Sequence, residues 1–249
     1  MSDSQNDILI DVQDVWKSFE DLEVLKGVSL KVHTGSSDVI LGRSGIGKSV
    51  LLKSIVGLLR PEQGSIKVMG QQVIGLKTRD LNEMRKSIGY VFQYAALYDS
   101  LTVRENLEFP LRKHSDAGEE EITERVFEQL RLVGLESAVD KMPSELSGGM
   151  KKRIGLARAI IKRPRIVLYD EPTAGLDPIT AREISELILS LEEQFGITSI
   201  TVTHDLECAR IVANQIYILD DGVFQHSGTF DELKRSTDPY TRAFFQVVV

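Results

Sequence analysis

The chain has 249 residues, of which 42% are hydrophobic and 27% are charged, so it is long enough to bury a large core and polar enough to cover it. No apolar run approaches the ~18 residues that predict a membrane-spanning helix, and the polar, acidic residues 1–7 do not predict a signal peptide. A net charge of -7, from 30 basic and 37 acidic residues, disfavours nonspecific attraction to nucleic acid or anionic lipid.

The N-terminal part of the chain predicts β-structure. Residues 8–15 and 24–32 are rich in β-branched side chains, and shorter strands are expected at 65–68 and 72–74, on either side of Gly70. Because these segments are close in sequence and separated by turn residues, we expect them to pair as one antiparallel layer.

A glycine-rich loop follows the first strands and predicts a phosphate site. Its glycines let successive backbone N–H groups converge on phosphate oxygens, Lys48 adds a positive charge, and the hydroxyl of Ser49 suits Mg²⁺. A helix is expected over residues 48–59, with its positive N-terminal end toward the same anion. The residues assigned to this nucleotide loop are Gly42, Arg43, Ser44, Gly45, Ile46, Gly47, Lys48, Ser49 and Val50.

A buried strand is expected over residues 86–92, and Gln93 follows it. From about residue 101 to 163 the strand signals give way to helical ones. A helix over residues 147–162 is predicted to end before Pro164. The apolar side chains that recur at helical spacing in this region are Ile122, Val126, Leu130 and Val133.

The apolar run 166–169 predicts a buried parallel strand that ends in Asp170 and Glu171. Ligands bind at the carboxyl ends of strands in open α/β sheets, and two adjacent buried carboxylates need a cation or a water to act on. We therefore expect Asp170 to bind Mg²⁺ and Glu171 to orient, or accept a proton from, an attacking water. The alternative is two acids that begin a surface turn before Pro172.

The C-terminal third predicts further alternation of helix and strand. Asp177 caps a helix that begins at Pro178, and strands are expected at 197–203 and 215–219. The single cysteine, Cys208, cannot form an internal disulfide and is expected to be a small core side chain in a reducing compartment.

The segment Leu146-Ser-Gly-Gly-Met150 provides a second anion site, because Ser147 can cap the next helix while Gly148 and Gly149 leave its first N–H groups open. Together with the phosphate loop and the Asp170–Glu171 pair, this segment resembles the nucleotide-binding subunits of ATP-binding cassette (ABC) transporters, over about residues 8–230.

The resemblance implies an α/β fold: a phosphate-loop ATPase core with a mostly parallel sheet, an antiparallel β subdomain and an inserted helical subdomain. The corresponding ranges are one domain over 8–240, with the core and β layer in 8–93 and 164–240, the helical subdomain in 94–163, and a C-terminal tail over 241–249 that either covers the core or binds a neighbour.

The resemblance also implies ATP and Mg²⁺, held in a head-to-tail homodimer between the phosphate loop of one subunit and Ser147, Gly148 and Gly149 of the other. Gln93 matches the glutamine that contacts Mg²⁺ or the water. His204 matches a histidine that contacts the γ-phosphate, and Asp177 lies in a loop that reaches across the dimer. Met150 departs from the family, which has glutamine there.

Stacking of the adenine ring requires a flat apolar face. Phe19 lies at about the family's usual distance before the phosphate loop and is the preferred residue, with Trp16 as the alternative.

The segment 93–112, with residues 142–150 and 177–180, resembles the ATPases of Mla/Mce phospholipid transport systems. That resemblance implies an integral membrane permease of the MlaE type, a small STAS-domain regulatory subunit, and a peripheral position on the cytoplasmic face of the inner membrane. Four residues either line a groove for a permease helix or pack within the helical subdomain: Leu97, Tyr98, Leu101 and Phe109.

Two other functions use the same nucleotide site. One is an importer ATPase for a small polar solute such as an amino acid. The other is a cassette ATPase acting on DNA or ribosomes, which the absence of a basic patch and of long coiled-coil insertions disfavours; no nucleic-acid partner is expected.

Overall fold

The computed structural model describes residues 7–114 and 118–246. Outside the described residues lie 1–6, which include most of the segment considered for a signal peptide, the short segment 115–117, and the last three positions of the predicted tail. Within the described part of the chain, no helix combines the length and the apolarity needed to cross a membrane.

The predicted antiparallel layer is confirmed, as a sheet with the strand order β2-β1-β4-β5. Both long strands extend beyond the predicted ranges, so that they form one continuous hairpin in which Phe19 pairs with Leu22. Side chains such as Val12 and Val15 are buried on its inner face. The strands are β1 (Ile8–Phe19), β2 (Leu22–His33), β4 (Gln63–Val68) and β5 (Gln71–Gln72).

The second sheet has the order β10-β9-β3-β8-β7-β6, with parallel pairing from β9 through β6 and β10 antiparallel at the edge. This mostly parallel sheet confirms the α/β fold class. Its strands are β3 (Ser37–Leu41), β6 (Ile88–Val91), β7 (Ile166–Asp170), β8 (Thr198–Thr203), β9 (Gln215–Asp220) and β10 (Val223–Gly228).

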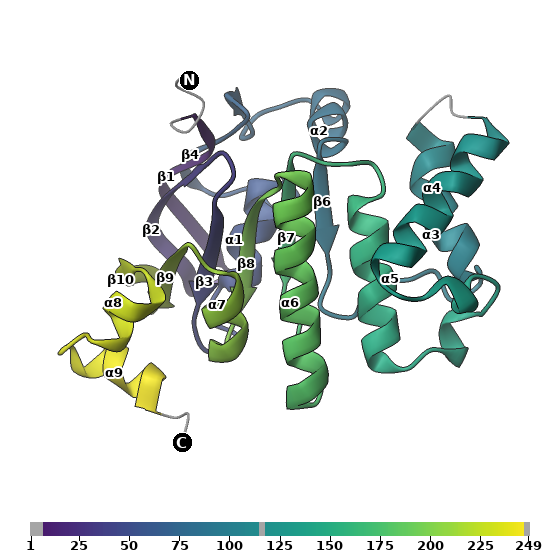
Figure 1. Ribbon diagram of the computed structural model, residues 1–249. Coiled ribbons are helices and arrows are strands. Elements are labelled where there is room, and N and C mark those ends of the chain that lie inside the picture. Colours follow the sequence, from purple (N-terminus) through teal and green to yellow (C-terminus); the bar gives the residue numbers. More distant parts are fainter. Residues whose placement is uncertain (1–6, 115–117, 247–249) are drawn as a thin grey trace, which may run out of the picture.

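Helices cover both faces of the parallel sheet (Figure 1). Alternate residues of β7 explain this: Leu168 packs in the cluster that contains α1 (Lys48–Ile55) and the antiparallel sheet, whereas Val167 packs in the cluster that contains α6 (Pro178–Phe195) and α7 (Leu206–Val212). A strand buried on both sides must be apolar throughout, as 166–169 are.

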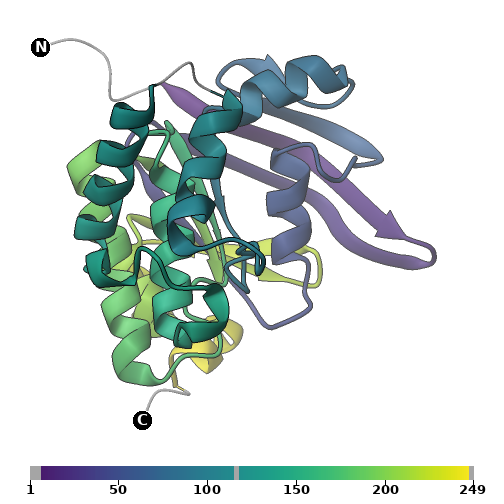
Figure 2. The ribbon, with the colours of Figure 1, turned by 90° about the vertical axis from the view of Figure 1, so that its right-hand side faces the viewer.

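The predicted helical region is confirmed and projects to one side of the sheet (Figures 1 and 2). It has its own core, in which the predicted side chains Ile122, Val126, Leu130 and Val133 are buried. Its elements are α3 (Val103–His114), α4 (Glu119–Leu132), the 3₁₀ turns Glu136–Ala138 and Pro143–Glu145, and α5 (Gly148–Ile160).

Three local expectations differ from the structure. The helix predicted over 48–59 ends at Ile55, because Gly57 adopts a left-handed conformation with φ +66° and Leu58 N–H turns back to the carbonyl of Lys53. The strand predicted over 86–92 begins at Ile88, since the preceding residues complete the turn after α2 (Thr78–Arg85). The short strand predicted over 72–74 lies at Gln71–Gln72. In addition, α2 and β3 were not expected from the sequence.

The C-terminal segment returns to the core. Residues 241–246, predicted as part of a tail, belong to α9 (Pro239–Gln246), which packs on α8 (Phe230–Lys234). The rings of Phe230 and Phe245 lie 5.2 Å apart, and Phe244 also packs against the core cluster around α6. Aromatic side chains in this arrangement remove apolar area from water at little entropic cost.

Two carboxyl groups are buried near the amino ends of the parallel strands. Glu192 of α6 is 4% exposed, and the Ser37 hydroxyl donates to its Oε2 at 2.5 Å. Burial raises the pKa of Glu192 to about 7 and that of Asp38 to about 6. Since the folded state binds these protons more tightly than the unfolded state, the free energy of unfolding falls as the pH rises from the unfolded pKa values toward the folded ones.

We therefore expect Glu192→Gln to flatten the pH dependence of stability and to raise the melting temperature at about pH 8, where Glu192 is charged in the parent. The gain is at most a few kcal/mol, as the shift in pKa implies. Thermal unfolding at about pH 5 and pH 8 measures it, with Glu193→Gln, an exposed neighbour, as the control. An unchanged pH profile in Glu192→Gln would contradict the assignment.

Candidate active site

Segments far apart in the sequence meet at the carboxyl ends of β3, β7 and β8. The N–H of Gly42 donates to the carbonyl of Thr203 at 3.3 Å, and the N–H of Glu171 donates to that of Val202 at 2.9 Å. The three loops surround a cavity of about 210 Å³. The residues that line it are Ser44, Gly45, Gly47, Lys48, Ser49, Val50, Gln93, Glu171 and His204.

The phosphate loop is shaped by glycine at two positions. Gly47 has φ +112°, and a Cβ there would lie 2.8 Å from Val24 Cγ1, so a larger residue would push the loop from β2. Gly45 has φ +81° and no atom within 4 Å of the position of a Cβ. The loop therefore has the open concave surface that a phosphate chain needs.

Lys48 is buried at the start of α1 and has three oxygen partners. Its Nζ donates to the carbonyls of Gly42 and Arg43 at 2.7 and 2.9 Å, and it lies 3.1 Å from Glu171 Oε1. Both side chains of this ion pair are less than 10% exposed. An ammonium held by two loop carbonyls is placed to meet a further anion at the mouth of the loop.

The Glu171 carboxylate contacts Lys48, Thr203 and His204. Its Oε2 lies 2.9 Å from His204 Nδ1 and accepts from the Thr203 hydroxyl at 3.3 Å, while Oε1 faces Lys48. Its backbone has φ 49°, an unfavourable conformation for a non-glycine residue. Such strain persists only where surrounding contacts enforce it, and here it turns the carboxylate from the strand end into the cavity.

Asp170 and Ser49 form the hard-oxygen part of the site. The Ser49 hydroxyl donates to Asp170 Oδ1 at 2.6 Å, and the Tyr90 hydroxyl donates to Oδ2 at 3.2 Å. Burial, followed by the charge of Asp170, raises the pKa of Tyr90, which therefore stays a neutral donor.

These donors fit Mg²⁺. Magnesium takes hydroxyl, carboxylate and amide oxygens and is bound by few protein groups together with substrate phosphates and water. Among the described residues, no group of three His, Cys, Asp or Glu side chains forms an all-protein metal cage. Ser49 and Gln93 line the small cavity, whereas Asp170 does not line it but is in contact with Ser49.

Sequence reasoning did not single out Lys152. This residue of α5 is 6% exposed, and its Nζ donates to the carbonyl of Gln93 at 2.6 Å and to that of Glu171 at 3.0 Å. Burial lowers the pKa of Lys152 to about 8, against the raising effect of the nearby carboxylates. In the run Met150-Lys151-Lys152-Arg153 only the helix orientation reveals which cation points inward.

The second anion motif lies away from the cavity of the same chain. Ser147 caps α5 by accepting from the N–H of Met150 at 3.2 Å, and Asp177 caps α6 by accepting from the N–H groups of Ile179 and Thr180. Both caps are as predicted. Neither Ser147, Gly148 and Gly149 nor Asp177 lines the 210 Å³ cavity, so a single chain does not bring the two motifs together at that cavity.

Phe19 and Trp16 lie in different environments on β1. Phe19 ends the strand with 42% of its surface exposed, and Lys17 Nζ lies 5.0 Å from the centre of its ring. Trp16 donates from Nε1 to Asp14 at 3.0 Å, and its ring carbons lie 3.4 Å from the place of a Cβ on Gly27. Neither ring lines the small cavity, but Phe19 is exposed whereas Trp16 is half-buried.

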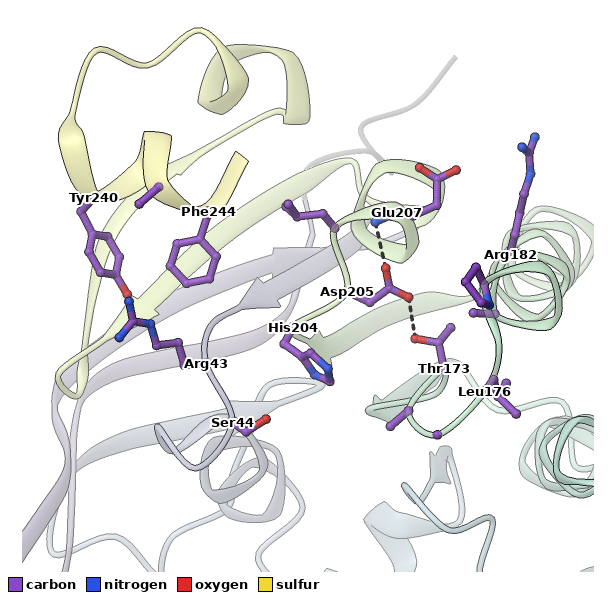
Figure 3. Close-up of a pocket in the computed structure, with 16 residues that line it drawn as sticks. Arg43, Ser44, Thr173, Leu176, Arg182, His204, Asp205, Glu207, Tyr240 and Phe244 are labelled. Atoms are coloured by element: carbon purple, nitrogen blue, oxygen red, sulfur yellow. Dashed lines mark hydrogen bonds between the residues drawn. The ribbon is translucent and has the colours of Figure 1, made fainter. Parts of the chain in front are cut away.

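A larger cavity of about 770 Å³ lies beside the first, between the loop after β7, the loop after β8 and α9 (Figure 3). Thr173 donates to Asp205, which ties two of these segments together. Arg43 lies beside the ring of Tyr240 in this cavity and does not line the smaller one, whereas Ser44 and His204 line both. The other two phosphate-loop residues outside the small cavity, Gly42 and Ile46, lie against Leu219 and the core.

The geometry is that of a nucleotide-binding cassette, and comparison with known proteins agrees. The family described as "ABC transporter" matches residues 25–174, which is more than half of the chain. The protein belongs to this family and is an ATP-hydrolysing, ATP-binding subunit of an ABC transporter.

The names of its relatives give different transported substrates. The chain is 41% identical over 237 residues to the probable ribonucleotide transport ATP-binding protein mkl of Mycobacterium leprae, covering 95% of this chain and 68% of that one. It is 41% identical to the intermembrane phospholipid transport system ATP-binding protein MlaF of Haemophilus influenzae, covering 94% and 88%. It is 38% identical to the methionine import ATP-binding protein MetN of Carboxydothermus hydrogenoformans, covering 92% and 68%. The chain spans about two thirds of the length of the mycobacterial relatives.

Among solved structures, the chain resembles one chain of the dimeric structure of the ATP-binding cassette MJ0796 bound to ADP and Pi. The TM-score is 0.81 at 34% identity, and the alignment covers 89% of this chain and 98% of the other. An identity of this size, together with the matching fold, extends the family assignment to nearly all of the described residues.

We expect Phe19→Ala to weaken ATP binding roughly tenfold, because a base stacked on an aromatic ring gains ~1–3 kcal/mol. Trp16→Leu, which removes the ring at the alternative position and keeps an apolar side chain, is expected to leave the affinity nearly unchanged. Calorimetric titration with a nonhydrolysable ATP analogue and Mg²⁺ measures both. If Trp16→Leu alone weakens binding, adenine stacks at the other position.

Proposed function

We propose that this subunit drives the transport of phospholipid, or of another hydrophobic molecule, through a membrane permease. The observation that carries the proposal is the 41% identity to the phospholipid transport protein MlaF over 94% of this chain. It is joined by an exposed aromatic surface beside Gln93. The proposal includes a permease partner, a STAS-domain regulatory subunit and a peripheral position on the cytoplasmic face of the inner membrane.

The contacts support the following catalytic roles. Lys48, held by two loop carbonyls, stabilises negative charge on the phosphates with the loop amides. Mg²⁺, when bound, would supply positive charge that offsets the charge of the phosphates. Ser49, Asp170 and Gln93 would hold the ion, while Glu171 accepts the proton of the attacking water or orients it. His204, 2.9 Å from Glu171, keeps that carboxylate aligned.

Phosphates and Glu171 compete for Lys48. In this structure Lys48 pairs with Glu171, which neutralises the carboxylate. A phosphate drawn to Lys48 would weaken that pairing and leave Glu171 free to act on a water. Binding of the substrate would thereby prepare the base for its reaction.

The second grip on the nucleotide comes from another copy of the chain. Ser147, Gly148 and Gly149 do not line the small cavity of their own chain, and the resembling MJ0796 cassette is a dimer. In a head-to-tail homodimer, these residues would close over the phosphates bound by the partner, and the loop containing Asp177 would cross the interface. ATP then favours the closed dimer by binding it more tightly than the open one.

The segment after Gln93 forms the proposed permease surface. Tyr94 is 86% exposed, and the rings of Tyr98 and Phe109 lie 4.9 Å apart with both side chains exposed. Of the four residues for which a permease groove and packing in the helical subdomain were the alternatives, Leu97 packs partly against the helical core and Leu101 is half-buried. Exposed aromatic side chains next to one another are typical of protein contact sites.

An importer for a small polar solute is the second candidate. The 38% identity to the methionine importer subunit MetN supports it, because the nucleotide site is shared and the difference lies in the docking surface.

Glu171→Gln is expected to lower ATP hydrolysis by about two to four orders of magnitude, the usual contribution of a general base, and to trap an ATP-bound dimer. Light scattering after gel filtration with Mg²⁺ and ATP should then give about twice the 27.8 kDa of one chain. Glu193→Gln, an exposed carboxylate of α6, serves as the control. Hydrolysis close to the parental rate in Glu171→Gln would refute the role of Glu171.

Affinity purification from detergent-solubilised membranes of the source cells is expected to recover an integral membrane protein together with phospholipid, identified by mass spectrometry. Replacing Tyr94 and Tyr98 by Asp should reduce this recovery severalfold, because charge disrupts an apolar contact. Leu58→Asp, at an exposed apolar position after α1, should not change the recovery. A permease without lipid that binds an amino acid would instead favour the importer.

A further inference from the structure

One face of α5 is attached to the turn that carries Gln93. The contact is made at Lys152, Gly155 and Arg158, and positions three residues apart are neighbours on the surface of a helix. Lys152 donates to the carbonyl of Gln93 at 2.6 Å, and Arg158 donates to that of Ala95 at 2.9 Å. Between them, the backbone at Gly155 lies so close to the turn that an added Cβ would be 3.2 Å from Ala95 Cβ.

Lys152 has a second connection, and this one leads into the active site. The same Nζ donates to the carbonyl of Glu171 at 3.0 Å. Two peptide groups that are 78 positions apart in the numbered sequence, those of Gln93 and Glu171, thus share one ammonium. The group is buried, so water does not replace these hydrogen bonds if the ammonium is lost.

The backbone on both sides of this bridge is in an unfavourable conformation. Glu171 has φ 49°, and Ala95 and Ala96 have φ 58° and 48°. Non-glycine residues adopt this region only under the constraint of their neighbours. Contacts to the adjoining carbonyls are therefore part of what keeps the Glu171 carboxylate turned into the cavity and the turn in its folded path.

We propose that Lys152 is a positioning residue: its ammonium ties the backbone of Glu171 to the turn at Gln93, and so transmits displacement of that turn to the hydrolytic carboxylate. The proposal rests on the role assigned to Glu171 above. Tyr94 lies between Gln93 and Ala95, whose carbonyls accept from α5, and it is the most exposed large side chain of this turn. A partner bound to Tyr94 would therefore displace the same backbone that is hydrogen-bonded to Lys152.

The test is a comparison of steady-state ATP hydrolysis by the full chain and four variants. Lys152→Met removes the ammonium and keeps the length of the side chain, Lys152→Arg keeps the charge and several donors, and Lys152→Gln keeps one donor group. Lys151→Met is the matched control, because Lys151 is the adjacent lysine of α5 and is less buried than Lys152.

A small misplacement of a catalytic group lowers the rate by up to about a hundredfold. We therefore expect Lys152→Met to lower kcat by about tenfold to a hundredfold with KM for ATP changed by less than about twofold, Lys152→Arg to recover most of the rate, and Lys151→Met to behave like the parent. If Lys152→Met does not fold, Lys152→Gln provides the test and should show the same loss of kcat at unchanged KM.

Two results would overturn the proposal. One is a parental kcat in Lys152→Met, or in Lys152→Gln where Met prevents folding. The other is a parallel loss of kcat, affinity and melting temperature that Lys152→Arg does not recover, which is the pattern of a structural defect. Glu171→Gln is measured in the same assay. If Glu171→Gln remains active, the proposed role of Glu171 is wrong. If Glu171→Gln is inactive and Lys152→Met is fully active, only the positioning role of Lys152 is refuted.

Discussion

The buried ion pair between Lys48 and Glu171 is the interaction on which the arrangement of this site depends. Neither group is tolerated in a protein interior without a partner, since an uncompensated buried charge costs several kcal/mol. Two loop carbonyls on one side, and His204 with Thr203 on the other, complete the hydrogen bonding of the pair. The pair thus holds charges that are expensive to bury at the place where a nucleotide would use them.

The topology explains how these groups meet. Because β8 lies between β3 and β7, the loop that leaves β3 is a neighbour of the loops that leave β7 and β8, although it is more than a hundred positions from either in the sequence. Hydrogen bonds between the loops, such as that from Gly42 to Thr203, hold them in register. The order of the strands in this sheet therefore brings the phosphate loop, Glu171 and His204 together.

The sequence was most informative where a short contiguous pattern carries both chemistry and conformation. Lys48, Ser49, Asp170 and Glu171 could be placed in one site because glycines and strand ends next to them restrict the backbone. The strand β3 was missed because its apolar run has only three residues and follows the charged Asp38, whose carboxyl is in fact buried with a raised pKa. Lys152 was missed because tertiary packing decides which lysine of a basic helical run turns inward, and no local pattern records that choice.

The protected state of Cys208 has a practical consequence. The thiol belongs to α7 and is buried in the core, and burial raises its pKa to about 12, which disfavours the thiolate that reacts with alkylating reagents. Since the sequence contains this one cysteine, we expect the protein to react only slowly with maleimides without replacement of Cys208. Spin labels, fluorophores or cross-linkers introduced through engineered surface thiols would therefore report from a single chosen position per protomer.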